Sequence, residues 1–207
     1  MKRISFILMA MLVVPSICLH AQEPSREWRK EFINLGFPNT TMSQDNVQDL
    51  KSNYGAAFTY GRTYFLHKPI GDILRFGIDA NWIDLNYTVY DIKHITNWET
   101  QKYQYKQCEI SLHVGPSITF EPVKKLAIHA YFQYAPSIAS IYTGDTEKYY
   151  GNFASLWIAG GNISYGFIGL GIESRFGDTN YKPWGSSKSE NINSSLSGFR
   201  AYLTFKY

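Results

Sequence analysis

Serine and histidine side chains occur close together in the middle of the chain, at spacings that raise the question of catalysis. Ser111, His113 and Ser117 are separated by two or four residues. A serine beside a histidine is the pair that activates a nucleophile in hydrolytic enzymes, including lipid-modifying ones. In an extended strand, however, residues two apart simply share one face. No strained nucleophile turn surrounds either serine, so we interpret the three residues as a polar strand face and predict that the protein is not an enzyme.

Histidine and glutamate side chains raise the separate question of a metal site. His113 and His129 lie in segments that we expect to be neighbouring strands, and Glu109 and Glu173 are expected in the same interior. Two histidines and a carboxylate are suitable ligands for zinc. The sequence contains no His-x-x-x-His or Cys-x-x-Cys spacing that would support such a site. We therefore predict hydrogen-bonding roles for these residues, with no metal and no cofactor.

Alternating polar and apolar residues predict the strands that position these side chains. In the final segment, one face carries Phe199, Ala201, Leu203, Phe205 and Tyr207, and the other carries Arg200, Tyr202, Thr204 and Lys206, because successive side chains of a strand point to opposite faces. Similar alternation predicts eight strands, at 29–37, 53–65, 72–87, 105–120, 124–138, 153–165, 167–176 and 197–207. After Trp82 the apolar residues move from even-numbered to odd-numbered positions. This change of parity predicts a β-bulge near Ile83–Asp84.

The connections between the predicted strands alternate in length. Those at 66–71, 121–123 and 166 are short, and those at 38–52, 88–104, 139–152 and 177–196 are long and polar. An up-and-down barrel in an outer membrane has short periplasmic turns on one rim and longer extracellular loops on the other. The segment 88–104 also fits a hairpin that extends its two strands beyond the membrane and turns near Thr96-Asn97. The pattern predicts an all-β, eight-stranded antiparallel transmembrane barrel with four longer extracellular loops.

The N-terminus has the features of an export signal. Basic residues precede an apolar run, Ile4–Leu19, and Ala21 provides a small residue for cleavage. We expect a cleaved signal peptide at 1–21, export through the Sec pathway, and a single barrel domain at 22–207. Loss of the two basic residues at positions 2 and 3 lowers the formal charge from +3 to +1, which gives no electrostatic reason to expect nucleic acid as a partner.

The polar strand faces carry charges of both signs. The residues concerned are Arg75, Asp79, Glu109, His113, His129, Glu173, Arg175 and Arg200. The interior of an eight-stranded barrel is just wide enough for side chains to fill it, so we predict that this set forms a structural polar network in a filled lumen. A soluble lipocalin-like carrier, with its apolar face turned inward around a ligand, is the alternative. It is disfavoured because charged residues make up only 18% of the chain.

Aromatic residues are expected to collect at the two membrane interfaces. The candidates for the periplasmic girdle are Phe65, Phe120, Tyr165 and Tyr207, and those for the outer girdle are Tyr54, Trp82, Tyr87, Tyr105, Tyr134 and Phe176. Arg62 falls on an apolar face, and we expect it near the periplasmic interface, where its long side chain can reach water.

The chain resembles the small eight-stranded outer-membrane barrels of the OmpA/OmpX type, in the porin-like superfamily. The resemblance covers nearly all of the mature chain and rests on the alternation, the loop rhythm and the terminal aromatic residue. It implies an outer-membrane location, contact with membrane lipid and lipopolysaccharide, and assembly by the barrel assembly machinery. The implied terminal-strand signal consists of Phe199, Leu203, Phe205 and Tyr207. One departure is Arg200, which stands where such strands often carry a glycine.

These observations predict a non-enzymatic outer-membrane protein with a structural or surface-interaction role. Its loops would contact an extracellular or envelope protein partner, or the lipopolysaccharide layer, because loops on a rigid scaffold commonly carry binding. An outer-leaflet lipid-modifying enzyme and a soluble ligand carrier are the alternatives.

Overall fold

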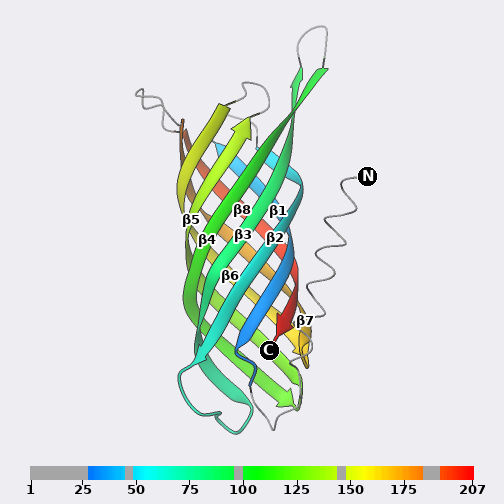
Figure 1. The fold of residues 1–207 in the computed structure, drawn as a ribbon, viewed down its shortest axis with the longest axis vertical. Coiled ribbons are helices and arrows are strands. Elements are labelled where there is room, and N and C mark those ends of the chain that lie inside the picture. The colour runs from blue at the N-terminus through cyan, green and yellow to red at the C-terminus, as the bar shows by residue number, and fades with distance from the viewer. Residues whose placement is uncertain (1–27, 45–48, 96–99, 144–147, 184–191) are drawn as a thin grey trace.

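The chain folds into one closed barrel of eight antiparallel strands, paired in sequence order (Figure 1). The computed structural model describes residues 28–44, 49–95, 100–143, 148–183 and 192–207. The strands are β1 (Glu31–Gln44), β2 (Leu50–Phe65), β3 (Leu74–Ile95), β4 (Thr100–Val123), β5 (Leu126–Thr143), β6 (Lys148–Tyr165), β7 (Ile168–Pro183) and β8 (Ile192–Lys206). Pairing of β1 with β8 closes the barrel, and the predicted fold class is confirmed. Among the described residues, no helix is long and apolar enough to cross a membrane.

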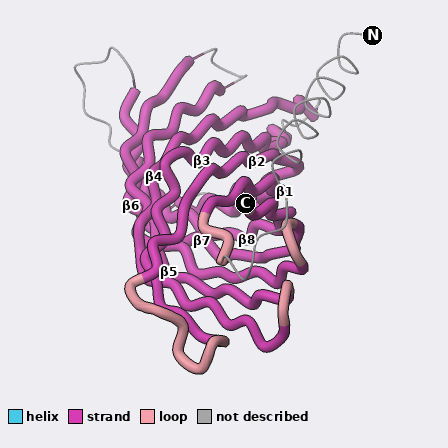
Figure 2. The backbone as a smooth tube through the Cα atoms, turned by 60° about the horizontal axis from the view of Figure 1, so that its bottom comes forward, coloured by secondary structure: helices cyan, strands magenta, loops and turns pink. Residues whose placement is uncertain are grey.

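The first and last described residues meet at one end of the barrel. Glu31 and Tyr207 exchange two backbone hydrogen bonds, of 3.1 and 2.9 Å. The connections 66–73, 124–125 and 166–167 lie at the same end (Figure 2), which we call the turn end; the opposite end is the loop end. The expected signal peptide falls in residues 1–27, outside the described residues.

The strands continue farther toward the loop end than the sequence pattern predicts. Most residues of the four expected long loops belong to strands, so the predicted alternation in connection length is wrong: the turn 66–73 is as long as the connection 184–191. These segments contain β-branched and aromatic residues, such as Thr88-Val89-Tyr90, that favour strands. Pairing also satisfies their backbone hydrogen-bonding groups. The hairpin interpretation of 88–104 is confirmed, because β3 and β4 pair as far as Ile95 and Thr100; its turn lies outside the described residues.

A β-bulge interrupts β3 where the parity slips. The register between β3 and β4 shifts between Asn81 and Asp84, and the two residues between them, Trp82 and Ile83, are both exposed on the outer surface. Two consecutive outward residues return Asp84 to the lumen, where it is completely buried. The predicted bulge is therefore confirmed, and it determines which acidic side chain enters the barrel interior.

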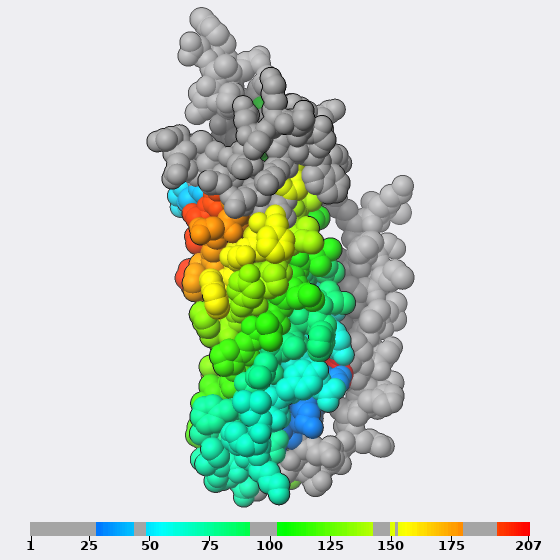
Figure 3. All heavy atoms as spheres, turned by 90° about the vertical axis from the view of Figure 1, so that its left-hand side faces the viewer, coloured from blue at the N-terminus to red at the C-terminus, as the bar shows by residue number. Residues whose placement is uncertain are grey.

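The outward strand faces form a continuous apolar belt, whereas charged side chains are buried inside. Figure 3 shows the wall from outside, where side chains of neighbouring strands close the surface. On β7 and β8 the belt consists of Ile168, Leu170, Ile172, Phe176, Phe199 and Leu203, all exposed. This arrangement is the reverse of a lipocalin, which buries its apolar face and exposes its charges. The soluble lipocalin-like alternative is therefore wrong.

Two of the expected girdle aromatics do not face outward. Phe65 packs edge-on against Trp28 at the turn end, with ring centroids 5.6 Å apart, because its neighbour Tyr64 takes the outward position. Tyr105 packs in the lumen beside a buried apolar cluster. The other expected girdle residues are exposed: Tyr54, Trp82, Tyr87, Phe120, Tyr134, Tyr165, Phe176 and Tyr207.

Arg62 lies at the turn end, as its position on β2 predicts. Its guanidinium is 3.3 Å from the Glu31 carboxylate and 5.4 Å from the centre of the Tyr64 ring. A charge at this position avoids the centre of the apolar belt, where it would be most costly.

Candidate functional site

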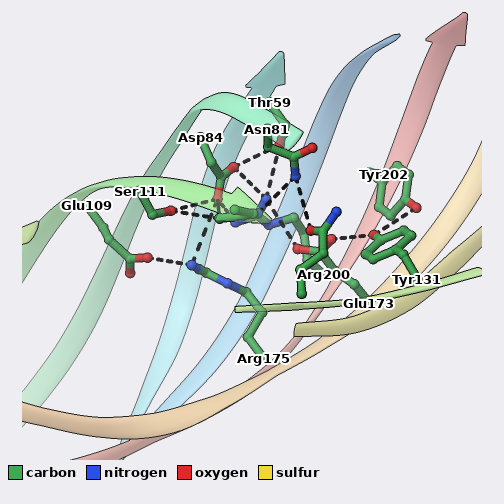
Figure 4. Close-up of polar contacts among 12 residues, drawn as sticks. Thr59, Asn81, Asp84, Glu109, Ser111, Tyr131, Glu173, Arg175, Arg200 and Tyr202 are labelled. Carbon is green, nitrogen blue, oxygen red and sulfur yellow. Dashed lines mark hydrogen bonds and ion pairs between the residues drawn. The ribbon is translucent and has the colours of Figure 1, made fainter. Parts of the chain in front are cut away.

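Charged side chains from four strands meet in the lumen (Figure 4). This charge cluster consists of Asp84 on β3, Glu109 on β4, Glu173 and Arg175 on β7, and Arg200 on β8. The Arg200 guanidinium donates two hydrogen bonds to the Asp84 carboxylate, of 2.8 and 3.0 Å, and lies 3.3 Å from a Glu173 oxygen. Arg175 pairs with Glu109 and is 3.9 Å from Asp84. Each carboxylate therefore has a cation within ion-pair distance.

Burial makes these pairings necessary. All five side chains are at most 5% exposed, and a buried ion is tolerated only when it is paired and hydrogen-bonded. Thr59 donates a further hydrogen bond of 2.8 Å to Asp84, and Tyr131 donates one of 2.6 Å to Glu173. The cluster thus joins β2, β5, β7 and β8 to β3 and β4 across the lumen.

Ser111 and His113 are in contact, but their geometry is not that of a catalytic triad. Ser111 Oγ lies 2.8 Å from His113 Nε2, and the Asp84 carboxylate lies 3.1 Å from the same nitrogen. In a triad the acid holds the other ring nitrogen, so that Nε2 is free to take the serine proton. Here Nδ1 faces the Asn81 amide at 2.9 Å. Ser111 is also only 1% exposed, which leaves a substrate no access to its hydroxyl.

A second polar cluster lies closer to the turn end. The His129 ring nitrogen Nε2 is 2.7 Å from the Asp79 carboxylate, and Thr63 and Ser117 donate hydrogen bonds of 2.7 and 2.8 Å to that carboxylate. The other ring nitrogen of His129 lies 2.8 Å from Thr119 Oγ1. His113 and His129 therefore belong to different clusters. Within the part of the chain that the structure describes, no group of three His, Cys, Asp or Glu residues is arranged to hold a metal ion.

Two lumen-facing glycines provide the space that large side chains need. A Cβ atom on Gly36 would lie 2.7 Å from Arg200 Cδ, and one on Gly171 would lie 2.2 Å from the Tyr202 ring. Both distances are too short for a real contact. Gly36 on β1 thus leaves room for the Arg200 side chain, and Gly171 on β7 leaves room for the Tyr202 ring.

An apolar layer fills the lumen on the loop side of the charge cluster. Its buried members are Ala135, Ala154, Leu156, Ile158 and Leu196, and a second apolar group beyond it contains Met42, Tyr90 and Ile141. The prediction of a polar lumen is wrong for this layer. β6 contributes three of its residues and also carries outward apolar residues such as Trp157, so both of its faces are apolar and its alternation is weak.

The structure distributes the predicted lumen residues over three places. Glu109, His113, Glu173, Arg175 and Arg200 lie in or beside the charge cluster, and Asp79 and His129 form the second cluster. Arg75 is also on the lumen face of β3 but lies at the turn end, where its guanidinium is 4.5 Å from the centre of the Trp28 ring and 4.9 Å from that of Phe65. Asp84, the central residue, is missing from the predicted set. The break in the alternation beside Asp84 indicated its inward position, because a bulge reverses which face the following residues occupy.

Comparison with known proteins gives similarity of architecture only. No family model matches the chain, and no curated protein matches it. Among solved structures, it is similar to Neisserial surface protein A, with 14% identity, a TM-score of 0.48, and coverage of 86% of this chain and 97% of that one. It is similar to Ail, the attachment invasion locus protein of Yersinia pestis, with 8% identity, a TM-score of 0.41, and coverage of 86% and 100%. It is also similar to the outer membrane protease OmpT from Escherichia coli, with 9% identity, a TM-score of 0.44, and coverage of 90% and 100%.

These similarities assign no activity, since they are remote and the proteins named include a protease. The architecture rests on the chain itself: eight strands in a closed barrel, an apolar outer belt and a charged interior. The protein has the fold of a small outer-membrane β-barrel.

Proposed function

We propose that the protein is a non-enzymatic outer-membrane barrel whose role is carried by the part of the wall that projects beyond the apolar belt at the loop end. The observation that carries this proposal is the β3–β4 hairpin. In the backbone ladder its outer part, Asp91–Gln104, pairs only within itself among the described residues, because β2 reaches β3 no farther than Tyr90 and β5 reaches β4 no farther than Tyr105. At its base, the Asn53 side chain of β2 donates a hydrogen bond of 2.7 Å to the Asp91 carboxylate. A two-stranded arm with two open edges offers backbone groups to a partner.

The change from apolar to polar outward residues along the strands supports placing the loop end outside the membrane. On β7 the outward side chain changes from Phe176 to Asp178, and on β8 from Phe199 to Ser195. The wall beyond the belt is therefore suited to water or to the lipopolysaccharide layer. Both ends of the described chain lie at the turn end, as expected if the short turns face the periplasm.

The contents of the lumen support a role without catalysis or a wide pore. The charge cluster and the apolar layer occupy the interior from the middle of the barrel toward the loop end, and eight strands leave no room for an open channel around them. The Ser111–His113 contact, which favours the alternative of an outer-leaflet lipid-modifying enzyme, is buried and lacks triad geometry. We therefore expect an extracellular or envelope protein partner to bind the arm.

The proposal is tested by shortening the arm. Residues 91–104 would be replaced by Asn-Gly, which forms a two-residue hairpin turn directly between Tyr90 and Tyr105, a pair in the wild-type ladder. Replacing the turn 124–125 by Asn-Gly is the matched control at the other end of the barrel. We expect the arm variant to fold but to lose cross-links to surface partners on intact cells, whereas the control keeps them.

Unchanged cross-links in the arm variant would contradict a role for the arm. Lipid A mass spectra from cells with and without the protein test the enzymatic alternative. We expect identical spectra; a mass change that Ser111→Ala abolishes would show that the protein is an enzyme.

A further inference from the structure

The lumen contains a large cavity at the turn end, on the opposite side of the charge cluster from the apolar layer. Its volume is about 1300 Å³, more than the roughly 300–1,000 Å³ of typical ligand pockets. Its deepest lining residues include Asp79, Asn81 and Gln133, and no member of the charge cluster lines it. The cavity is therefore a blind vestibule that opens at the turn end.

One cation in the wall of this vestibule has no carboxylate in direct contact. Lys206 is on the lumen face of β8, with the same parity as the buried residues Tyr202 and Thr204, and lines the cavity. Within the described chain no carboxylate lies within ion-pair distance of its ammonium group, and Asp79 and Glu121 act on it only from farther away, whereas neighbouring Arg62 is paired with Glu31. Lining residues with basic side chains number seven and those with carboxylates number four. The vestibule thus favours an anion.

Three lining asparagines each have an amide oxygen without a hydrogen-bond donor. The amide oxygens of Asn34 on β1, Asn81 on β3 and Asn162 on β6 accept no hydrogen bond within the described chain, although each residue is more than nine-tenths buried. A buried amide oxygen without a donor is costly. Chloride and sulfate have no donors to give these oxygens and hydrogen phosphate has at most two, whereas a polyol phosphate brings further hydroxyl groups on its carbon chain. The ligand chemistry that satisfies both features combines a negative charge with several hydroxyl groups.

We propose that the vestibule is a binding site for a polyol phosphate. The phosphate contacts Lys206, and the hydroxyl groups lie between Asn34 and Asn162. Such a group occurs in free sugar or glycerol phosphates and in lipid headgroups that carry a polyol, such as that of phosphatidylglycerol. The site is at the opposite end from the arm, so its existence does not depend on the proposed surface role.

Titration calorimetry of the purified full barrel with sn-glycerol 3-phosphate tests this proposal. We expect saturable binding, with weaker binding of inorganic phosphate, which lacks the carbon-borne hydroxyl groups, and of glycerol, which lacks the charge. Lys206→Gln should weaken binding by about tenfold or more, because it removes a charge-assisted contact. Lys106→Gln is the matched control, since Lys106 is exposed on the outer face of β4 and does not line the cavity.

A second variant separates loss of the site from loss of folding. Ala127 is a small buried residue in the vestibule wall, and Ala127→Leu should reduce binding by filling space without changing charge. Folding of every variant is checked by gel shift on boiling. Competition by phosphatidylglycerol, but not phosphatidylcholine, in nanodiscs would assign the ligand to lipid headgroups; no competition would assign it to a free polyol phosphate. No saturable binding, or equal binding by folded Lys206→Gln, would overturn the proposal.

Discussion

Replacing Arg200 by Leu should strongly destabilise the barrel. Arg200 is 2% exposed, and it supplies both guanidinium hydrogen bonds to Asp84 and the cation nearest to Glu173. The variant would leave Asp84 with hydrogen bonds from neutral groups, with His113 and with the more distant Arg175 at 3.9 Å, and it would leave Glu173 with the Tyr131 hydroxyl. Removing one partner of a buried ion pair costs about 3–5 kcal/mol of unfolding free energy.

The free energy is measured by urea unfolding in lipid vesicles, followed by tryptophan fluorescence. Arg62→Leu is the control: the Arg62 side chain is 41% exposed in its pair with Glu31, so its loss should cost only about 0–1 kcal/mol. The double variant Arg200→Leu with Asp84→Leu should recover part of the lost stability, because the Asp84 charge is removed together with its main partner while Glu173 still lacks Arg200. Equal losses for Arg200→Leu and Arg62→Leu, or a double variant less stable than Arg200→Leu alone, would refute the central role of this pair.

Three further substitutions test other parts of the barrel by the same titration. Leu156→Ala in the lumen layer should cost about 2–5 kcal/mol through the cavity it leaves, and lipid-facing Leu170→Ala distinctly less; equal costs would mean that Leu156 does not lie in a packed interior. Gly171→Ala should cost about 1–3 kcal/mol by overpacking, and Tyr202→Leu in the same chain should relieve most of that cost if the ring is the obstacle. Ile172→Arg, near the middle of the belt, should cost about 2–4 kcal/mol; no cost would argue against lipid at that position.

Period-two alternation was sufficient to predict the number of strands and the outward face of most of them. It succeeded on β7 and β8 because lipid and lumen impose opposite polarity on successive residues. It failed toward the loop end, where residues such as Thr88 and Ser195 lie in paired strands beyond the belt. Water on the outside removes the contrast between the two faces, so polar hairpins look like loops in the sequence.

The position of a residue in the alternation predicts which face of its strand it occupies, but not which side chains of other strands it contacts. It placed His113 and His129 inside, but their separation into two clusters depends on strand stagger around the barrel, which the sequence does not state. Asp84 was hidden by the bulge, and the lumen position of Leu156 was hidden because β6 is apolar on both faces. The vestibule was equally inaccessible, since it depends on how far side chains from several strands reach across the lumen.

The most direct test of the account is the electrophoretic mobility of the protein from an outer-membrane fraction, run on SDS gels with and without boiling. A barrel with lipid outside and paired charges inside should resist detergent until heated, so we predict a membrane-fraction band that migrates differently after boiling. A single band unaffected by boiling, with the protein recovered in the soluble periplasmic fraction, would contradict the assignment of the apolar belt to lipid.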